Sequence, residues 1–148
     1  MKRLFFILFI LAAQITLAQK SNSIGFACGY SGTPSKSVKE MNKLVESSNY
    51  NKIRRKINSR ENASRCLAII VSEILEEKGI IRLTQKEKKR ILTTYNSNKK
   101  ISVCAGCTYF NEMTLKEILN EIAVDEFGFN FKKIAREYYE RQIINNKR

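Results

Sequence analysis

The stretch from Glu61 to Lys78 constrains the fold most, because its apolar residues fall on every side of a helix. These residues are Ala63, Cys66, Leu67, Ala68, Ile69, Ile70, Val71, Ile74 and Leu75. A helix that is apolar all round is buried on several sides, and Gly79 supplies a C-terminal stop. The stretch therefore predicts a central helix against which the other elements pack.

The first eighteen residues have the form of a secretion signal. Lys2 and Arg3 precede an unbroken apolar run over residues 4–13, and Thr16 and Ala18 place small residues at a peptidase site. A spanning helix needs about 20 apolar residues, so the run fits a signal better than an uncleaved membrane anchor, the alternative reading. We expect cleavage after Ala18 and no transmembrane segment in the mature chain.

The remaining sequence predicts one domain behind a short entry segment. Residues 19–35 are rich in Gly and Ser, contain the single proline and predict an extended segment, and residues 36–148 predict a helical domain. Helix starts are indicated at Ser35, Tyr50, Glu61, Thr84, Thr114 and Asn130. Residues 101–103 alternate as a brief extended piece. The predicted fold class is all-α, with about six helices in an irregular bundle or short helix-pair solenoid and the entry segment tethered to it.

The order of elements from Tyr50 to Tyr95 is a short helix, an apolar helix, a glycine turn and a capped helix. This order resembles the helix-pair units of HEAT-like and armadillo-like proteins, which implies stacked antiparallel helices. As a whole, the chain resembles a small exported helical protein of bacteria.

The four cysteines predict disulfide chemistry, because an even number in an exported chain favours bridges. Cys28 lies in the entry segment, and Cys104 and Cys107 flank a short turn. We expect Cys28 to bond either Cys104 or Cys107, since spacing does not decide connectivity. Cys66 is either a buried thiol or bonded to the remaining cysteine.

Two more specific interpretations of the cysteines, a redox pair and a zinc site, have less support in the sequence. A redox pair of Cys104 and Cys107 has the right spacing but lacks the surrounding strand–helix pattern. A four-cysteine zinc site would need two close pairs, and the sequence has one. We therefore expect no metal and no cofactor.

The chain contains no histidine. This excludes Ser-His-Asp and Cys-His catalysis and removes the commonest general base at neutral pH. A carboxylate-dependent hydrolase is the remaining hydrolytic alternative. Its candidate acids are Glu112, Glu117, Glu121, Asp125 and Glu126. Acids at this spacing usually form a solvated helix surface, so we assign no catalytic residue.

The chain is strongly basic, with a net charge of +13, which falls to +11 when Lys2 and Arg3 leave with the signal. The candidate basic surface is Lys52, Arg54, Arg55, Lys56, Arg60, Lys86, Lys88, Lys89 and Arg90. Such charge favours an acidic protein, a glycan or an anionic envelope surface, and export argues against nucleic acid. The sequence thus indicates a non-enzymatic binding module, with the redox protein and the secreted hydrolase as alternatives.

Export and cleavage can be checked by the intact mass of the protein recovered from a bacterial host. We expect a chain that begins at Gln19, because the signal should be removed after Ala18. A mass that still includes residues 1–18 would contradict the predicted signal.

Overall fold

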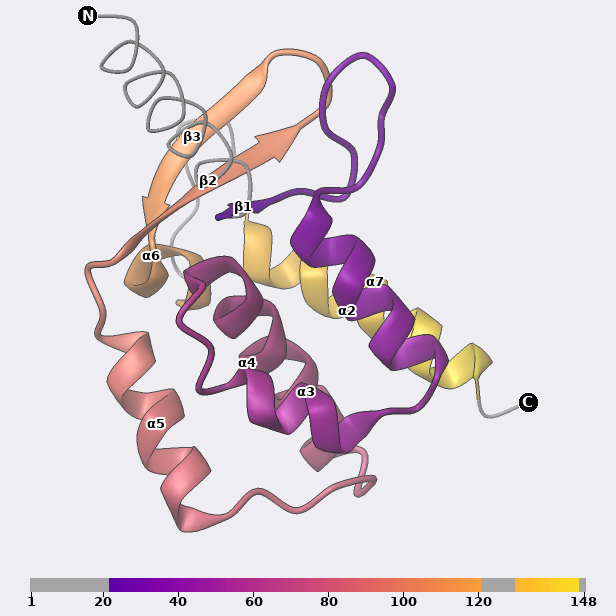
Figure 1. The fold of residues 1–148 in the computed structure, drawn as a ribbon, viewed down its shortest axis with the longest axis vertical. Helices are drawn as coiled ribbons and strands as arrows, with labels where there is room; N and C mark the ends of the chain where they lie inside the picture. The colour runs from indigo at the N-terminus through magenta and orange to yellow at the C-terminus, as the bar shows by residue number, and fades with distance from the viewer. Residues whose placement is uncertain (1–21, 121–129, 147–148) are drawn as a thin grey trace, which may run out of the picture.

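The computed structural model describes residues 22–120 and 130–146. Its elements are β1 (Ser23–Ile24), α2 (Lys36–Glu46), α3 (Tyr50–Lys56), α4 (Asn62–Glu77), α5 (Gln85–Tyr95), β2 (Lys100–Ala105), β3 (Tyr109–Thr114), α6 (Leu115–Leu119) and α7 (Phe131–Asn145). A small sheet lies at one end of the molecule, and the helices extend away from it (Figure 1).

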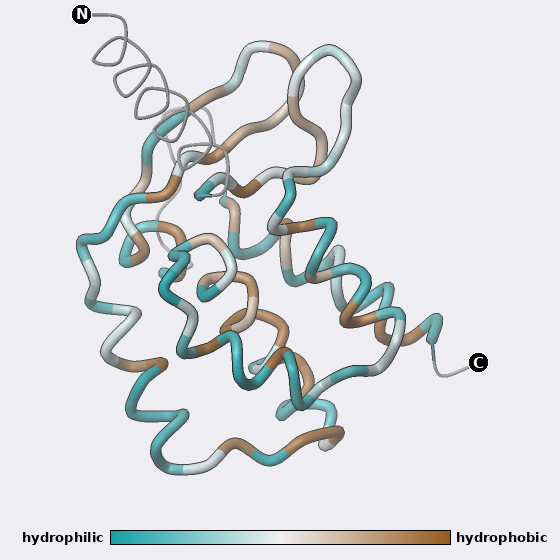
Figure 2. The backbone as a smooth tube through the Cα atoms, in the orientation of Figure 1, coloured by the Kyte–Doolittle hydropathy of each residue, from teal (hydrophilic) through white to brown (hydrophobic). Residues whose placement is uncertain are grey.

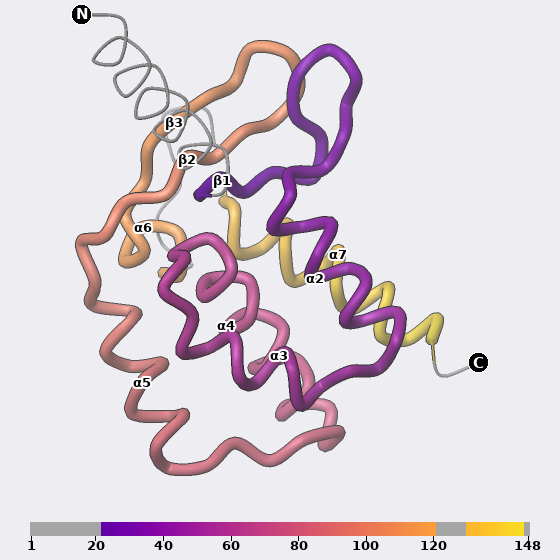
Figure 3. Tube along the Cα trace, viewed as in Figure 1, coloured from indigo at the N-terminus to yellow at the C-terminus, as the bar shows by residue number. Residues whose placement is uncertain are grey.

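The predicted all-α class is wrong, because the described residues include a three-stranded mixed sheet in the order β1-β2-β3. β1 pairs with β2 in parallel, and β2 pairs with β3 antiparallel. Figure 3 shows β1 lying beside β2 although a long stretch of chain separates them. The alternation at residues 101–103 indicated β2, but β3 buries only Met113 and so carries no alternating apolar pattern. The molecule is therefore α/β.

The predicted central helix is confirmed as α4. All its apolar side chains are buried, and most have no exposed surface. It contacts α2, α3 and α7, which surround it, and Figure 2 shows its largely apolar course through the middle of the molecule. Burial of this many aliphatic side chains makes α4 the main source of hydrophobic stabilisation.

Except for α4, whose N-cap residue Glu61 makes no capping bond, the predicted helices begin at side-chain caps. Thr84 opens α5 and Thr114 opens α6, each with a full capping box that Glu87 and Glu117 complete. Ser35 caps α2 by accepting from the backbone N–H of Val38. These local hydrogen bonds satisfy amides that the first helical turn leaves unpaired.

The entry segment is tied to the sheet by a disulfide between Cys28 and Cys104, whose Cα atoms are 5.4 Å apart. This is one of the two pairings that the sequence leaves open. Gly106 adds backbone hydrogen bonds on both sides, accepting from Gly29 at 2.9 Å and donating to Ala27 at 2.7 Å. The segment before α2 is therefore held along its length rather than tethered at one point.

Gly25 lies directly against the disulfide. A Cβ atom at this position would overlap the Cys104 carbonyl oxygen and the sulfur atoms of both bonded cysteines. Backbone and disulfide atoms cannot rotate away as the end of a flexible side chain can. The close approach of the entry segment to β2 therefore requires glycine.

We predict that Gly25→Ala lowers the free energy of unfolding by about 1–3 kcal/mol through overpacking, measured by urea denaturation. The same substitution in a Cys28→Ala/Cys104→Ala background should cost less, because both sulfur atoms are gone. An equal loss in the two backgrounds would show that the disulfide is not what Gly25 accommodates.

Candidate functional site

Helix α3 presents its cations outward because its one buried side chain, Ile53, anchors it to the core. Lys52 and Arg55 are exposed. They line an open cavity of about 380 Å³ together with Lys56, Asn58 and Ser59. The cavity wall is thus rich in positive charge.

A bidentate ion pair joins helix α5 to helix α3. Arg54 donates from Nε and Nη2 to the two carboxylate oxygens of Glu87, at 3.0 and 2.8 Å. These bonds, together with those from Thr84, outweigh burial and lower the pKa of Glu87 to about 2. Glu87 therefore both caps α5 and fixes it against α3.

The nine predicted basic residues fall into three groups. Three are matched by acids: Arg54 with Glu87, Lys56 with Glu40 and Lys88 with Glu76. Five are exposed and make no ion pair within the described ranges: Lys52, Arg55, Arg60, Lys86 and Lys89. The ninth, Arg90, turns partly inward and has a buried Nε. The Arg54–Glu87 pair thus connects the basic segments of α3 and α5, and acidic partners neutralise some of the cations in each segment.

The second disulfide left open by the sequence is not formed. Cys66 is a buried thiol in α4, and Cys107 is an exposed thiol at the β2–β3 turn. Burial raises the pKa of Cys66 far above its ordinary value, which makes it chemically inert. Cys104 is bonded to Cys28 and not to Cys107, so this bond does not support a redox pair at residues 104 and 107.

The carboxylates of the hydrolase hypothesis have structural roles where they are described. Glu112 pairs with Lys100 at 3.3 Å on an exposed sheet face. Glu117 accepts from Thr114 in the capping box of α6. The other three, at positions 121, 125 and 126, lie outside the described residues.

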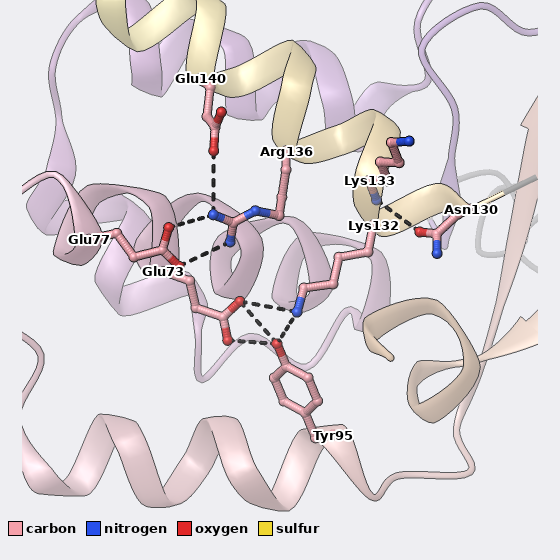
Figure 4. A network of polar contacts seen from close by, with 8 residues as sticks. All are labelled: Glu73, Glu77, Tyr95, Asn130, Lys132, Lys133, Arg136 and Glu140. Carbon is pink, nitrogen blue, oxygen red and sulfur yellow. Dashed lines mark hydrogen bonds and ion pairs between the residues drawn. The ribbon is translucent and has the colours of Figure 1, made fainter. Parts of the chain in front are cut away.

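A polar network that sequence patterns do not reveal joins α4, α5 and α7 (Figure 4). The Tyr95 hydroxyl donates to Glu73 at 2.7 Å, and Lys132 donates to the same hydroxyl at 2.7 Å. The Lys132 ammonium also lies 3.7 Å from the Glu73 carboxylate. Next to them, Arg136 bonds Glu77. No spacing rule links these residues, because they come from three separate helices.

The network compensates for a carboxylate that α4 carries into a largely buried position. Burial raises the pKa of Glu73, while the Tyr95 hydrogen bond and the Lys132 and Arg136 charges oppose this rise. Lys132 is itself 7 % exposed. The buried cation of Lys132 and the partly buried carboxylate of Glu73 are thus matched to each other, so the network fits a structural connection between helices better than an open reactive site.

Comparisons with family models, curated proteins and solved structures find no match for this chain. Among the described residues, no helix has the length and apolar character needed to cross a bilayer. No cluster of three or more metal-binding side chains occurs in residues 22–120 and 130–146.

We predict that Lys132→Met destabilises the protein by about 2 kcal/mol near neutral pH, because the partly buried Glu73 carboxylate would lose its cation. The raised pKa of Glu73 means that its neutral form is favoured as pH falls, so the loss should shrink from about pH 8 to about pH 5. Urea unfolding at both pH values measures this.

Two controls separate charge from packing in this test. In a Glu73→Gln background, Lys132→Met should have an effect that does not vary with pH, because the amide does not titrate. Lys133→Met, which removes an exposed neighbour, should change stability little. A pH-independent loss in the single Lys132→Met variant would contradict the assigned role.

Proposed function

We propose that this protein is an exported, non-enzymatic binding module that presents the α3/α5 basic surface to an acidic partner. We define this surface as the five unmatched, exposed cations: Lys52, Arg55, Arg60, Lys86 and Lys89. The observation that carries the proposal is that these five lack acidic partners within the described residues, while neighbouring cations on the same helices have them.

Unmatched cations on a fixed surface attract a polyanion at long range and need little desolvation to meet it. The Arg54–Glu87 pair supports this role, because it sets the position of α5 relative to α3 before any partner arrives. Each exposed contact contributes less than about 1 kcal/mol. Affinity would therefore come from several contacts together and would fall as salt screens them.

Export is part of the proposal and rests on two observations. The first eighteen residues have the form of a secretion signal. The Cys28–Cys104 disulfide is consistent with an oxidising compartment. Suitable partners in such a compartment are an acidic protein, a glycan or an anionic envelope surface, and the interaction needs no cofactor.

The test uses heparin as a model acidic glycan and the variant Lys52→Ala/Arg55→Ala/Lys86→Ala/Lys89→Ala. Loss of four contacts should weaken binding about tenfold near 50 mM salt, as measured by calorimetry. Binding of the unmodified protein should itself fall steeply between about 50 and 200 mM salt.

A matched control removes four exposed cations elsewhere: Lys36, Lys39 and Lys43 of α2 and Lys116 of α6. This variant has the same net charge as the first but keeps the α3/α5 basic surface, so it should retain most of the affinity. Equal losses in the two variants would mean that overall charge, rather than this surface, attracts the polyanion.

A further inference from the structure

An open cavity of about 330 Å³ lies at the start of α3, the helix that carries Lys52 and Arg55 of the α3/α5 basic surface. Residues 48–51 and Arg54 form one side of it, and residues 80–82 of the connector between α4 and α5 form the other. Both segments lie in the lower half of Figure 1, at the end of the molecule away from the sheet. We call this site the Tyr50 cavity.

One part of the cavity wall is apolar. Tyr50, Ile80 and Ile81 are partly buried and pack against the core. The backbone N–H groups of Ile80 and Ile81 donate to the carbonyl oxygen of Leu75, at 2.8 and 3.3 Å, which fixes the connector to the end of α4. The Tyr50 hydroxyl donates to Ser48 at 3.3 Å, which holds the ring against the turn before α3. An aromatic ring with apolar neighbours suits the face of a sugar ring that carries C–H groups.

Another part of the wall carries neutral side chains that can both donate and accept hydrogen bonds. Asn49 Oδ1 accepts from the backbone N–H of Lys52 at 3.2 Å, and no described residue accepts from the Asn49 amide N–H groups. Asn51 is exposed, and its amide makes no hydrogen bond in the part of the chain that the structure describes. Sugar hydroxyls need both kinds of partner, whereas a carboxylate only accepts. This wall therefore favours a ligand with hydroxyl groups over a purely anionic one.

Ser48 occupies a backbone conformation that favours glycine. Its φ is 52°, in the left-handed region, and its N–H donates to the carbonyl oxygen of Val45 at 2.9 Å, which closes the end of α2. Glycine is the usual residue at this place in a helix end, because it adopts the conformation without strain. The serine thus keeps, at a conformational cost, a hydroxyl that lies in the cavity wall.

Two arginines add positive charge to the wall. Arg54 is already matched, because it donates to both carboxylate oxygens of Glu87. Arg82 is exposed and makes no ion pair with any residue of 22–120 or 130–146. A guanidinium presents two N–H donors at the spacing of carboxylate oxygens. Arg82 is therefore the group that can pair with an acid on a ligand.

We propose that the Tyr50 cavity is a subsite for one uronic acid residue of an acidic glycan. The sugar ring would lie on Tyr50, its hydroxyls would bond the polar side chains of residues 48–51, and its carboxylate would pair with Arg82. Small-molecule sites have volumes of about 300–1,000 Å³. A cavity of about 330 Å³ therefore takes one sugar residue and leaves the rest of the glycan outside.

The inference deepens the proposed function and rests on it in one respect, namely that an acidic glycan is the partner of the α3/α5 basic surface. Helix α3 has seven residues and is therefore about 10 Å long. A glycan with one residue in the Tyr50 cavity can thus reach Lys52 and Arg55 with the next ones. The exposed cations would attract polyanions in general, and the cavity would select those built from sugars.

The experiment measures, by calorimetry, the binding of heparin, whose uronic acids carry carboxylates, and of polyglutamate, a carboxylated chain without sugar rings. It compares the unmodified protein, Asn51→Ala/Arg82→Met and the control Asn98→Ala/Lys99→Met. Each variant loses one exposed amide and one exposed cation, and neither loses a side-chain hydrogen bond or ion pair among the described residues, so both should fold. We expect Asn51→Ala/Arg82→Met to bind heparin at least about fivefold more weakly than the control does, and both variants to bind polyglutamate equally.

Equal heparin affinity in the two variants would overturn the subsite. An equal loss of heparin and polyglutamate affinity in Asn51→Ala/Arg82→Met would overturn its preference for sugars. The four-cation variant of the α3/α5 basic surface separates this inference from the proposed function. If heparin binding depends on the Tyr50 cavity but not on that surface, the proposed function fails and the subsite stands. If it depends on that surface but not on the cavity, the subsite fails and the proposed function stands. No heparin binding by the unmodified protein would overturn both.

Discussion

The rest of the structure depends on the burial of α4. Because this helix is apolar on all sides, α2, α3 and α7 can each cover part of it, and the sheet closes one end. The same burial limits the contact with water of the few polar side chains of α4. Arg65 is buried and Glu73 is partly buried, so partners inside the protein must replace much of the water that each charge loses.

The two residues meet this constraint differently. Glu73 gains a hydroxyl from Tyr95 and a cation from Lys132, so its charge is matched within the fold. Arg65 donates from Nε and Nη2 to one carbonyl oxygen, that of Ser59, and no acid of the described residues lies within ion-pair distance of it. The charge of Glu73 is therefore compensated by an opposite charge, whereas that of Arg65 is compensated only by a backbone dipole.

The sequence predicts features that are local and misses those that depend on distant partners. Helix starts follow from caps such as Thr84 and Glu87, three residues apart, and the buried helix follows from its own composition. Sequence patterns do not reveal the sheet, because β1 is two residues long and β3 is mostly exposed. Both strands depend on hydrogen bonding to β2 for their extended structure. Likewise, a run of cations does not reveal that Arg54 is matched from α5 while Arg55 is not.

Helix α5 is attached mainly by polar contacts, which links the stability of the α3/α5 basic surface to its electrostatics. Only Ile91 and Thr94 of this helix are buried. Glu87 holds its first turn to α3, and Tyr95 holds its last residue to α4. Ion pairs near a surface weaken as salt rises. The same ions that screen an acidic partner would therefore loosen the helix that carries Lys86 and Lys89, two of the five cations of the surface.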